Sequence, residues 1–139
     1  MEFQKIKLHR SEKNGAAVTQ ITLDDDYNVP DYRQDIVKVI KERGELRFDE
    51  VKAMEGAAWI KGSLVFKVLY RSDKQEGKIS CLRGEIPFQE RLNMDGLSEY
   101  DAVYATGDME DLTIGVINSR KLNVRAVIVL TASSEKEVD

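Results

Sequence analysis

The chain has 139 residues and a formal net charge of −4, with 21 Lys and Arg against 25 Asp and Glu. This length suits one globular domain, since a domain of roughly 150 residues buries about 68–70% of its unfolded surface and needs no metal or disulfide to fold. The acidic balance argues against a general binder of nucleic acid or of anionic membranes, although it leaves room for a local basic face.

Cysteine content and the N-terminus indicate the compartment. Cys81 is the only cysteine, so an internal disulfide is impossible. Its surroundings, Ile-Ser-Cys-Leu, favour a small apolar strand residue over a reactive thiol. The first residues lack an apolar signal core, and no apolar run approaches the ~20 residues that cross a bilayer. We therefore expect a cytoplasmic protein without membrane insertion.

The N-terminal part is expected to hold two short strands and a loop. Residues 1–10 and 17–23 alternate apolar and polar side chains, as strands do, with a polar turn over 11–15. Residues 24–30 read Asp-Asp-Asp-Tyr-Asn-Val-Pro and predict a loop, because Asp, Asn and Pro favour turns.

One amphipathic helix is predicted over residues 32–42. Asp31 is a suitable N-cap, and Gln34 stands at the capping-box distance. Tyr32 and Ile36 lie four residues apart, and Ile40 follows after four more, so they share one helix face. Gly44 would then provide the left-handed residue that ends the helix.

Everything after residue 44 is expected to be strand and turn. The alternation in residues 45–54 shifts phase near Val51, which predicts a bulge or an edge strand. Residues 57–71 form the longest strand, with Gly62 marking a bend. Its core face is apolar and comprises Ile60, Leu64, Phe66, Val68 and Tyr70. A hairpin loop over 72–77 leads to a return strand, 78–92, where Pro87 indicates an edge or a bulge.

The C-terminal part continues the pattern. A loop over 93–100 precedes a strand over 101–114, and the turn at residues 118–119 leads into a last strand, 120–131. After Ala126 both faces of this strand are apolar, so we expect it to be central in a sheet and buried on both sides. Residues 133–139 read as a charged tail or the start of a linker.

These elements predict a mainly β (α+β) fold. Short turns favour antiparallel order, because parallel pairs need crossovers of a dozen or more residues. We expect an antiparallel β-sandwich or partly closed barrel, with the helix near residues 32–42 covering one sheet or an open end. Residues 1–132 would form a single domain.

No pattern of catalytic or metal-binding residues is evident. The Asp24–Asp26 run lacks the spacing of a calcium loop and suits a solvated turn. His9 and Cys81 are the only soft ligands, too few for zinc, and His9 has no implied catalytic partner. Carboxylate pairs are numerous, but none stands in an apolar context that would raise a pKa. We expect no enzyme activity, no catalytic residue, no metal and no cofactor.

The most basic stretch is residues 118–125, where Lys121, Asn123 and Arg125 share one face of the expected strand. Two interpretations stand: a partner-binding stripe, or a polar sheet face whose arginines pair with nearby carboxylates. We predict that Asp31 or Asp35, at the start of the helix, lies near Arg120 or Arg125. The candidate partner-binding or helix-to-sheet residues are Asp31, Asp35, Arg120, Lys121, Asn123 and Arg125.

Four segments in order resemble the SPOCS domain family of endospore-forming bacteria, which includes SipL-like spore-coat morphogenetic proteins. They are residues 29–36 (VPDYRQDI), 62–70 (GSLVFKVLY), 84–88 (GEIPF) and 118–126 (NSRKLNVRA). The family often has a second proline where Gln34 stands here. Its members commonly carry several such domains and a C-terminal LysM module; the sequence contains one such domain, so the resemblance does not imply glycan binding for it.

The resemblance implies a non-enzymatic adaptor or scaffold in assembly of the spore envelope (coat) during sporulation, on the mother-cell side of the forespore. It implies protein partners of the spore envelope, and the acidic net charge argues against a nucleic-acid partner. Long strands with open edges also make a homodimer plausible. The alternative is a carbohydrate-binding module for cortex or cell-wall peptidoglycan, with Trp59, Tyr70 and Tyr104 as stacking candidates, although only 7% of the chain is aromatic.

Overall fold

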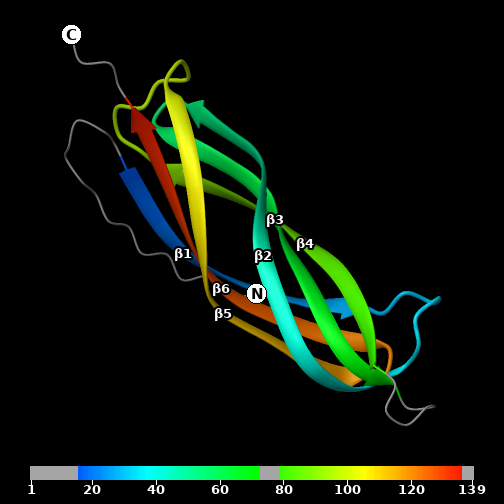
Figure 1. Cartoon of the computed structure of the whole chain (residues 1–139). Coiled ribbons are helices and arrows are strands. Elements are labelled where there is room, and N and C mark those ends of the chain that lie inside the picture. The colour runs from blue at the N-terminus through cyan, green and yellow to red at the C-terminus, as the bar shows by residue number, and fades with distance from the viewer. Residues whose placement is uncertain (1–15, 73–78, 136–139) are drawn as a thin grey trace.

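A computed structural model describes residues 16–72 and 79–135, which form two three-stranded antiparallel sheets packed face to face (Figure 1). We name each sheet after its central strand. The β6 sheet has the order β1-β6-β5 and the β3 sheet the order β2-β3-β4. The strands are β1 Ala16–Asn28, β2 Ile36–Met54, β3 Ala57–Ser72, β4 Ile79–Asn93, β5 Ala102–Asn118 and β6 Lys121–Glu135. The prediction of a mainly antiparallel β fold is confirmed.

The β3 sheet is built around the long apolar strand. Alternate β3 residues point inward, and the predicted core face is fully buried at Ile60, Leu64, Phe66, Val68 and Tyr70. A tight turn at residues 55–56 joins β2 to β3, where Gly56 adopts a φ of 76° that other residues rarely take. On the other side of β3 lies β4, an edge strand, as Pro87 predicted.

The β6 sheet supplies the opposing half of the core. Leu122, Val124, Ile128 and Leu130 alternate along β6 and are fully buried against the β3 sheet. As predicted, β6 is the central strand of its sheet. The expectation that both of its faces are buried is wrong for the outer face, where Val127 is only half-buried.

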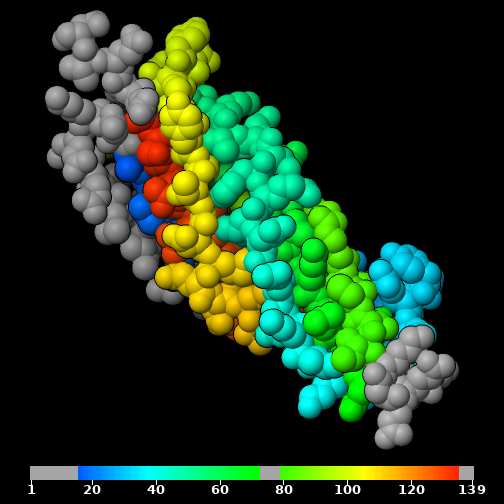
Figure 2. Space-filling model, in the orientation of Figure 1, coloured from blue at the N-terminus to red at the C-terminus, as the bar shows by residue number. Residues whose placement is uncertain are grey.

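The two sheets approach most closely where β2 lies beside β5, as Figures 1 and 2 show along the front of the molecule. Glycine makes this approach feasible. A Cβ atom on Gly107 of β5 would lie 2.5 Å from Leu46 Cδ1 and 3.1 Å from Phe48 Cζ on β2. Gly44 of β2 faces Leu112 of β5 in the same way, because a Cβ atom on Gly44 would lie 2.9 Å from Leu112 Cδ2. The sandwich is therefore partly closed along one side without a hydrogen-bonded ladder.

The predicted helix over residues 32–42 is wrong. Residues 31–33 form a turn, in which the Arg33 amide donates to the Pro30 carbonyl at 2.9 Å, and β2 begins at Ile36. Extra residues in β2 cause register shifts between Ile36 and Lys38 and between Val39 and Lys41. These bulges place inward residues three positions apart, which imitates the helical period. Gly44 consequently packs within a strand and caps no helix.

Other boundaries also differ from expectation. Residues 24–28 belong to β1 and not to a loop, since they pair with residues 121–125 of β6. The predicted irregularity near Val51 is confirmed as a register shift between Phe48 and Glu50 in an edge strand. The expected strand over 1–10, the turn over 11–15 and most of the 72–77 loop lie outside the described residues. No described residue belongs to a helix of the length and apolarity that crossing a membrane requires.

Candidate functional site

Two of the segments that carry the family resemblance meet at one end of the sandwich. The loop 29–35 leaves β1, and the turn 118–120 joins β5 to β6. The Val29 amide donates to the Arg120 carbonyl at 2.9 Å, and the Ile36 amide donates to the Ser119 carbonyl at 2.9 Å. Segments far apart in the sequence are thus joined through the backbone at both ends of the loop.

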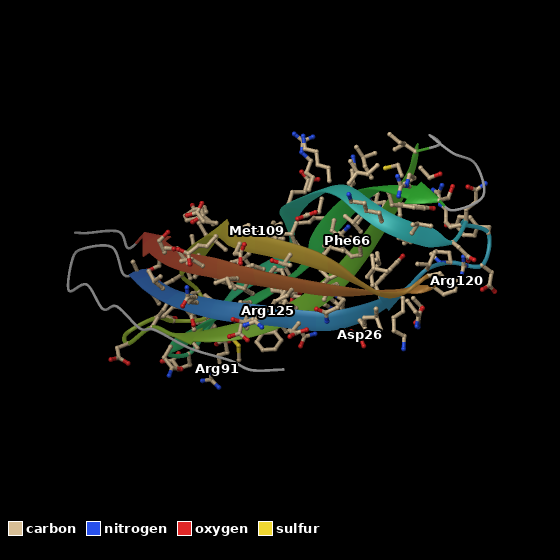
Figure 3. The ribbon with its side chains drawn as sticks, turned by 90° about the horizontal axis from the view of Figure 1, so that it is seen from below. Asp26, Phe66, Arg91, Met109, Arg120 and Arg125 are labelled. Atoms are coloured by element: carbon tan, nitrogen blue, oxygen red, sulfur yellow. The ribbon has the colours of Figure 1, made fainter. Side chains whose placement is uncertain are left out.

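The Arg120 side chain, labelled in Figure 3, donates hydrogen bonds to several residues of this loop. Its Nη1 atom donates to the Arg33 carbonyl at 2.7 Å and to Asp35 Oδ1 at 3.0 Å. Its Nη2 atom donates to the carbonyls of Pro30 at 2.8 Å and of Val29 at 3.3 Å. A planar guanidinium suits such a set, because its donors point in fixed directions. We call this arrangement the Arg120 clamp, and the part of the molecule that holds it the clamp end.

The structure brings together one of the predicted acid–base pairs. Asp35 and Arg120 form an ion pair at 3.0 Å, with both side chains a little more than one-third exposed. The pair joins a loop to a turn, because no helix is present there. Asp31 is exposed, and neither it nor Arg125 forms an ion pair within the part of the chain that the structure describes. Of the four predicted combinations, only Asp35 with Arg120 is therefore in contact.

The other candidates lie on the outer face of the β6 sheet. Lys121, Asn123 and Arg125 share that face, as predicted from their alternation. The Asn123 amide donates to Asp24 Oδ1 at 2.9 Å and to Asp26 Oδ1 at 3.1 Å. The two carboxylates are engaged across the strand pair. Over residues 16–72 and 79–135, no group of three or more potential metal ligands is found.

Tyr70 also supports the clamp end, a role that sequence reasoning did not predict. Its ring is fully buried, and its hydroxyl donates to the Gln34 carbonyl at 3.4 Å. Tyr70 is therefore unable to stack on a sugar, contrary to the earlier expectation. Trp59 and Tyr104 point from the outer faces of different sheets, as the strand register requires, and make no common platform. Cys81 lies in a strand as expected, but its side chain is exposed.

Several exposed apolar side chains belong to the loop and the strand ends that adjoin the clamp. Tyr32, at the tip of the loop, is 80% exposed, and the guanidinium of Arg33 lies 5.4 Å from its ring centre. Val37 and Ile40 occupy the first two of the three bulges of β2, and Ile117 occupies a further bulge near the end of β5. Because bulged residues leave the regular alternation, these side chains remain outside the core. The sequence pattern had assigned Ile40 to a helix and missed this exposure.

A family model described as SipL, SPOCS domain matches residues 35–117, more than half of the chain. The match extends from Asp35 through β2, β3 and β4 to the end of β5. Comparison with curated proteins found no match, and neither did comparison with solved structures. The matched segment contains the whole β3 sheet and the β2–β5 contact. The chain therefore belongs to the SipL SPOCS domain family of sporulation-associated domains.

Proposed function

We propose that this chain is a non-enzymatic protein-interaction domain that serves as a scaffold element in assembly of the spore envelope, on the mother-cell side of the forespore. Membership of the SipL SPOCS domain family supports the link to sporulation. The proposal of protein binding is carried by the exposed apolar side chains at the clamp end. Exposed apolar groups that gather at one place mark interaction sites more often than scattered ones do.

The clamp prepares these side chains for binding. Arg120 and Tyr70 fix the backbone of the loop at the Val29, Pro30, Arg33 and Gln34 carbonyls, so Tyr32 projects from an ordered turn. An anchor residue on a pre-ordered loop loses less conformational entropy on binding than one on a free loop. Tyrosine is also among the residues that most often dominate binding energy.

The polar groups of the clamp are engaged with one another, which supports a structural role for them. The Arg120 guanidinium faces carbonyls and Asp35, and Asn123 faces two carboxylates. An enzyme that used these groups would need them free to reach a substrate. We therefore assign Asp35 and Arg120 to positioning of the loop and Tyr32 to contact with the partner.

The test is a pull-down from a lysate of sporulating cells with the tagged chain, followed by mass spectrometry. Tyr32→Ala is compared with Tyr100→Ala, which removes an 89% exposed tyrosine from the loop between β4 and β5, at the opposite end of the sandwich. We expect a spore-envelope protein to be captured by the native chain and by Tyr100→Ala, and capture to fall about tenfold or more with Tyr32→Ala.

Two results would contradict the proposal. Equal capture of the partner by Tyr32→Ala and by the native chain would show that the clamp end is not part of the binding surface. Retention of the chain by purified peptidoglycan, without any protein partner, would favour the carbohydrate-binding alternative.

A further inference from the structure

The outer face of the β3 sheet carries a row of three cations. In the strand register, Lys67 of β3 lies directly opposite Arg43 of β2 on one side and Arg83 of β4 on the other. All three side chains are exposed. Like charges in directly opposite positions of a sheet destabilise the pairing, so such a row is unusual in a sheet that serves only its own stability.

The two rows on the Leu69 side of it continue the same charge, whereas the adjoining row on the other side, Glu45–Val65–Glu85, is acidic. Lys41 lies opposite Leu69, and Lys38 lies opposite Arg71, all on the outer face. We call Lys38, Lys41, Arg43, Lys67, Arg71 and Arg83 the basic face. The strand positions in the three rows of the basic face include no Asp or Glu.

Two carboxylates, Glu45 and Glu85, border the basic face, and one of them pairs with a cation of that face. Arg83 Nη1 lies 3.6 Å from Glu85 Oε2, and the other five cations form no ion pair within the described residues. Glu85 also binds Arg47 more closely, at 2.6 Å, and the hydrogen bonds from Arg47 to Asp49 and to Glu85 raise the pKa of Arg47 above its ordinary value. A depression of about 330 Å³, lined by Arg43, Gly44, Glu45, Val65 and Lys67, opens on this side. A group that entered it would lie beside the cations Arg43 and Lys67 and the carboxylate Glu45.

The opposite outer face, on the β6 sheet, has the opposite charge. Asp108 and Asp111 of β5 are exposed on it, and Asp24 and Asp26 of β1 lie on the same face further along the sheet, opposite Arg125 and Asn123 of β6. Glu110 belongs to the same surface, because its Oε1 atom accepts a hydrogen bond from Gln20 of β1 at 2.7 Å. We call these five carboxylates the acidic face. Lys121 and Arg125 are the cations among its strand positions.

We propose that the basic face of one copy of this domain docks onto the acidic face of a second copy. The inference rests on the proposed function, because it names a partner and a surface for a scaffold domain. The two faces are the outer sides of the two sheets of one sandwich, so each copy offers one face to each of two neighbours. Such a contact is heterologous and produces head-to-tail stacks.

Several properties of the surfaces favour this partner. Both are three-stranded sheets, and sheets stack face to face at about 10 Å, which brings long charged side chains within reach of one another. Exposed Leu69 and Ile79 among the cations supply apolar area that such a contact would bury. Opposite charges on facing surfaces orient partners and exclude wrong pairings.

The test uses analytical ultracentrifugation of the purified chain and of one variant for each face. Arg43→Glu with Arg83→Glu alters the basic face and leaves two glutamates opposite Lys67, an arrangement compatible with folding. Asp108→Lys with Asp111→Lys alters the acidic face. Lys52→Glu with Arg91→Glu is the matched control, since both residues are exposed on the same outer side of the β3 sheet and flank Trp59, away from the basic face.

For the native chain we expect an average mass that rises with concentration at about 0.01 M salt and falls to that of a monomer at about 1 M, where the Debye length is only ~3 Å. Each face variant alone should associate about tenfold or more weakly than the native chain, while the control behaves as the native chain does. An equimolar mixture of the two face variants should form a one-to-one dimer, because one supplies an intact acidic face and the other an intact basic face.

The inference is overturned if the native chain stays monomeric at low salt, or if the mixture of variants does not associate. It is also overturned if the basic-face variant loses binding only to vesicles that contain phosphatidylglycerol, which would make the partner an anionic membrane surface. Circular dichroism checks folding, and Lys41→Glu with Arg71→Glu replaces the basic-face variant if that variant does not fold. A monomeric native chain with intact Tyr32-dependent capture would refute stacking and leave the proposed function standing.

Discussion

Replacing Arg120 with alanine tests whether one side chain holds the clamp end together. The substitution removes the donors to the Pro30 and Arg33 carbonyls at 2.8 and 2.7 Å, the longer bond to Val29 and the ion pair with Asp35. The backbone bonds from Val29 and Ile36 to the turn remain, because they do not involve the side chain. The loop should stay attached at its two ends and loosen at its tip.

The expected loss follows from these contacts. A hydrogen bond contributes about 0.5–1.5 kcal/mol net, and one to a charged group about 1.5–3 kcal/mol when it is buried. The Arg120 side chain is 36% exposed, so we take about 1 kcal/mol for each short carbonyl bond. The solvent-exposed ion pair adds about 0–1 kcal/mol. The free energy of unfolding should therefore fall by about 2–3 kcal/mol, which lowers Tm by roughly 8–12 °C in a domain of this size.

Two matched variants separate the contributions. Arg120→Lys keeps the charge but loses the planar fork, so we expect it to recover no more than about 1 kcal/mol. Asp35→Asn removes the ion pair and leaves the carbonyl bonds, so its loss should be below about 1 kcal/mol and should disappear in about 1 M salt. The loss in Arg120→Ala should persist in salt.

Urea unfolding followed by circular dichroism measures all three variants, with the slope of the transition as a check that the unfolded state is unchanged. A loss below about 0.5 kcal/mol for Arg120→Ala would mean that the backbone bonds alone hold the loop. A loss in Asp35→Asn equal to that in Arg120→Ala would place the stabilisation in the ion pair and refute the role of the carbonyls.

The remaining predictions concern sites away from the clamp. Gly84→Ala should lower stability by about 1–3 kcal/mol, because its Cβ would meet the ring of Phe66, which packs edge-on against Tyr27 at 5.1 Å. Gly115→Ala is its control in thermal unfolding; nothing lies within 4 Å, so a loss there above about 0.5 kcal/mol would contradict the packing argument. Lys67→Glu should raise stability by about 0.5–2 kcal/mol at low salt, since it turns two like-charge neighbours into opposite-charge pairs; a lowered urea midpoint would show that the cation row does not repel.

Much of the β architecture could be predicted from the sequence, because one-sided burial leaves a two-residue alternation. Residues 57–71 and 120–131 show that alternation clearly, and both became central strands. Pro87 and the phase shift near Val51 identified edge strands, since edges tolerate a missing donor and an extra residue.

The start of β2 was misread for an identifiable reason. Ile36, Val39 and Glu42 are the less exposed positions, three residues apart, because bulges at Val37 and Ile40 interrupt the alternation. A spacing of three or four is also the signature of a helix. The run of β-branched residues at 36, 37, 39 and 40 was the available signal for a strand.

The clamp was predictable only in part. Opposite charge suggested that Asp35 and Arg120 would meet, and they lie 3.0 Å apart. The main acceptors of Arg120 are backbone carbonyls, however, and every residue has one, so the sequence does not identify them. The charge rows on the outer faces likewise depend on strand register, which the bulges at Val37 and Ile40 had concealed.

The β1 and β6 strands have a consequence for where a partner can approach this domain. Ala16 pairs with Ser133, which in turn pairs with Tyr104 near the loop that follows β4. The chain thus enters and leaves the described sandwich at the same end, and the loop that carries Tyr32 lies at the other end. Ala16 and Glu135, where the chain enters and leaves the described sandwich, therefore lie at the end remote from Tyr32. A partner that contacts Tyr32 does not meet these two positions.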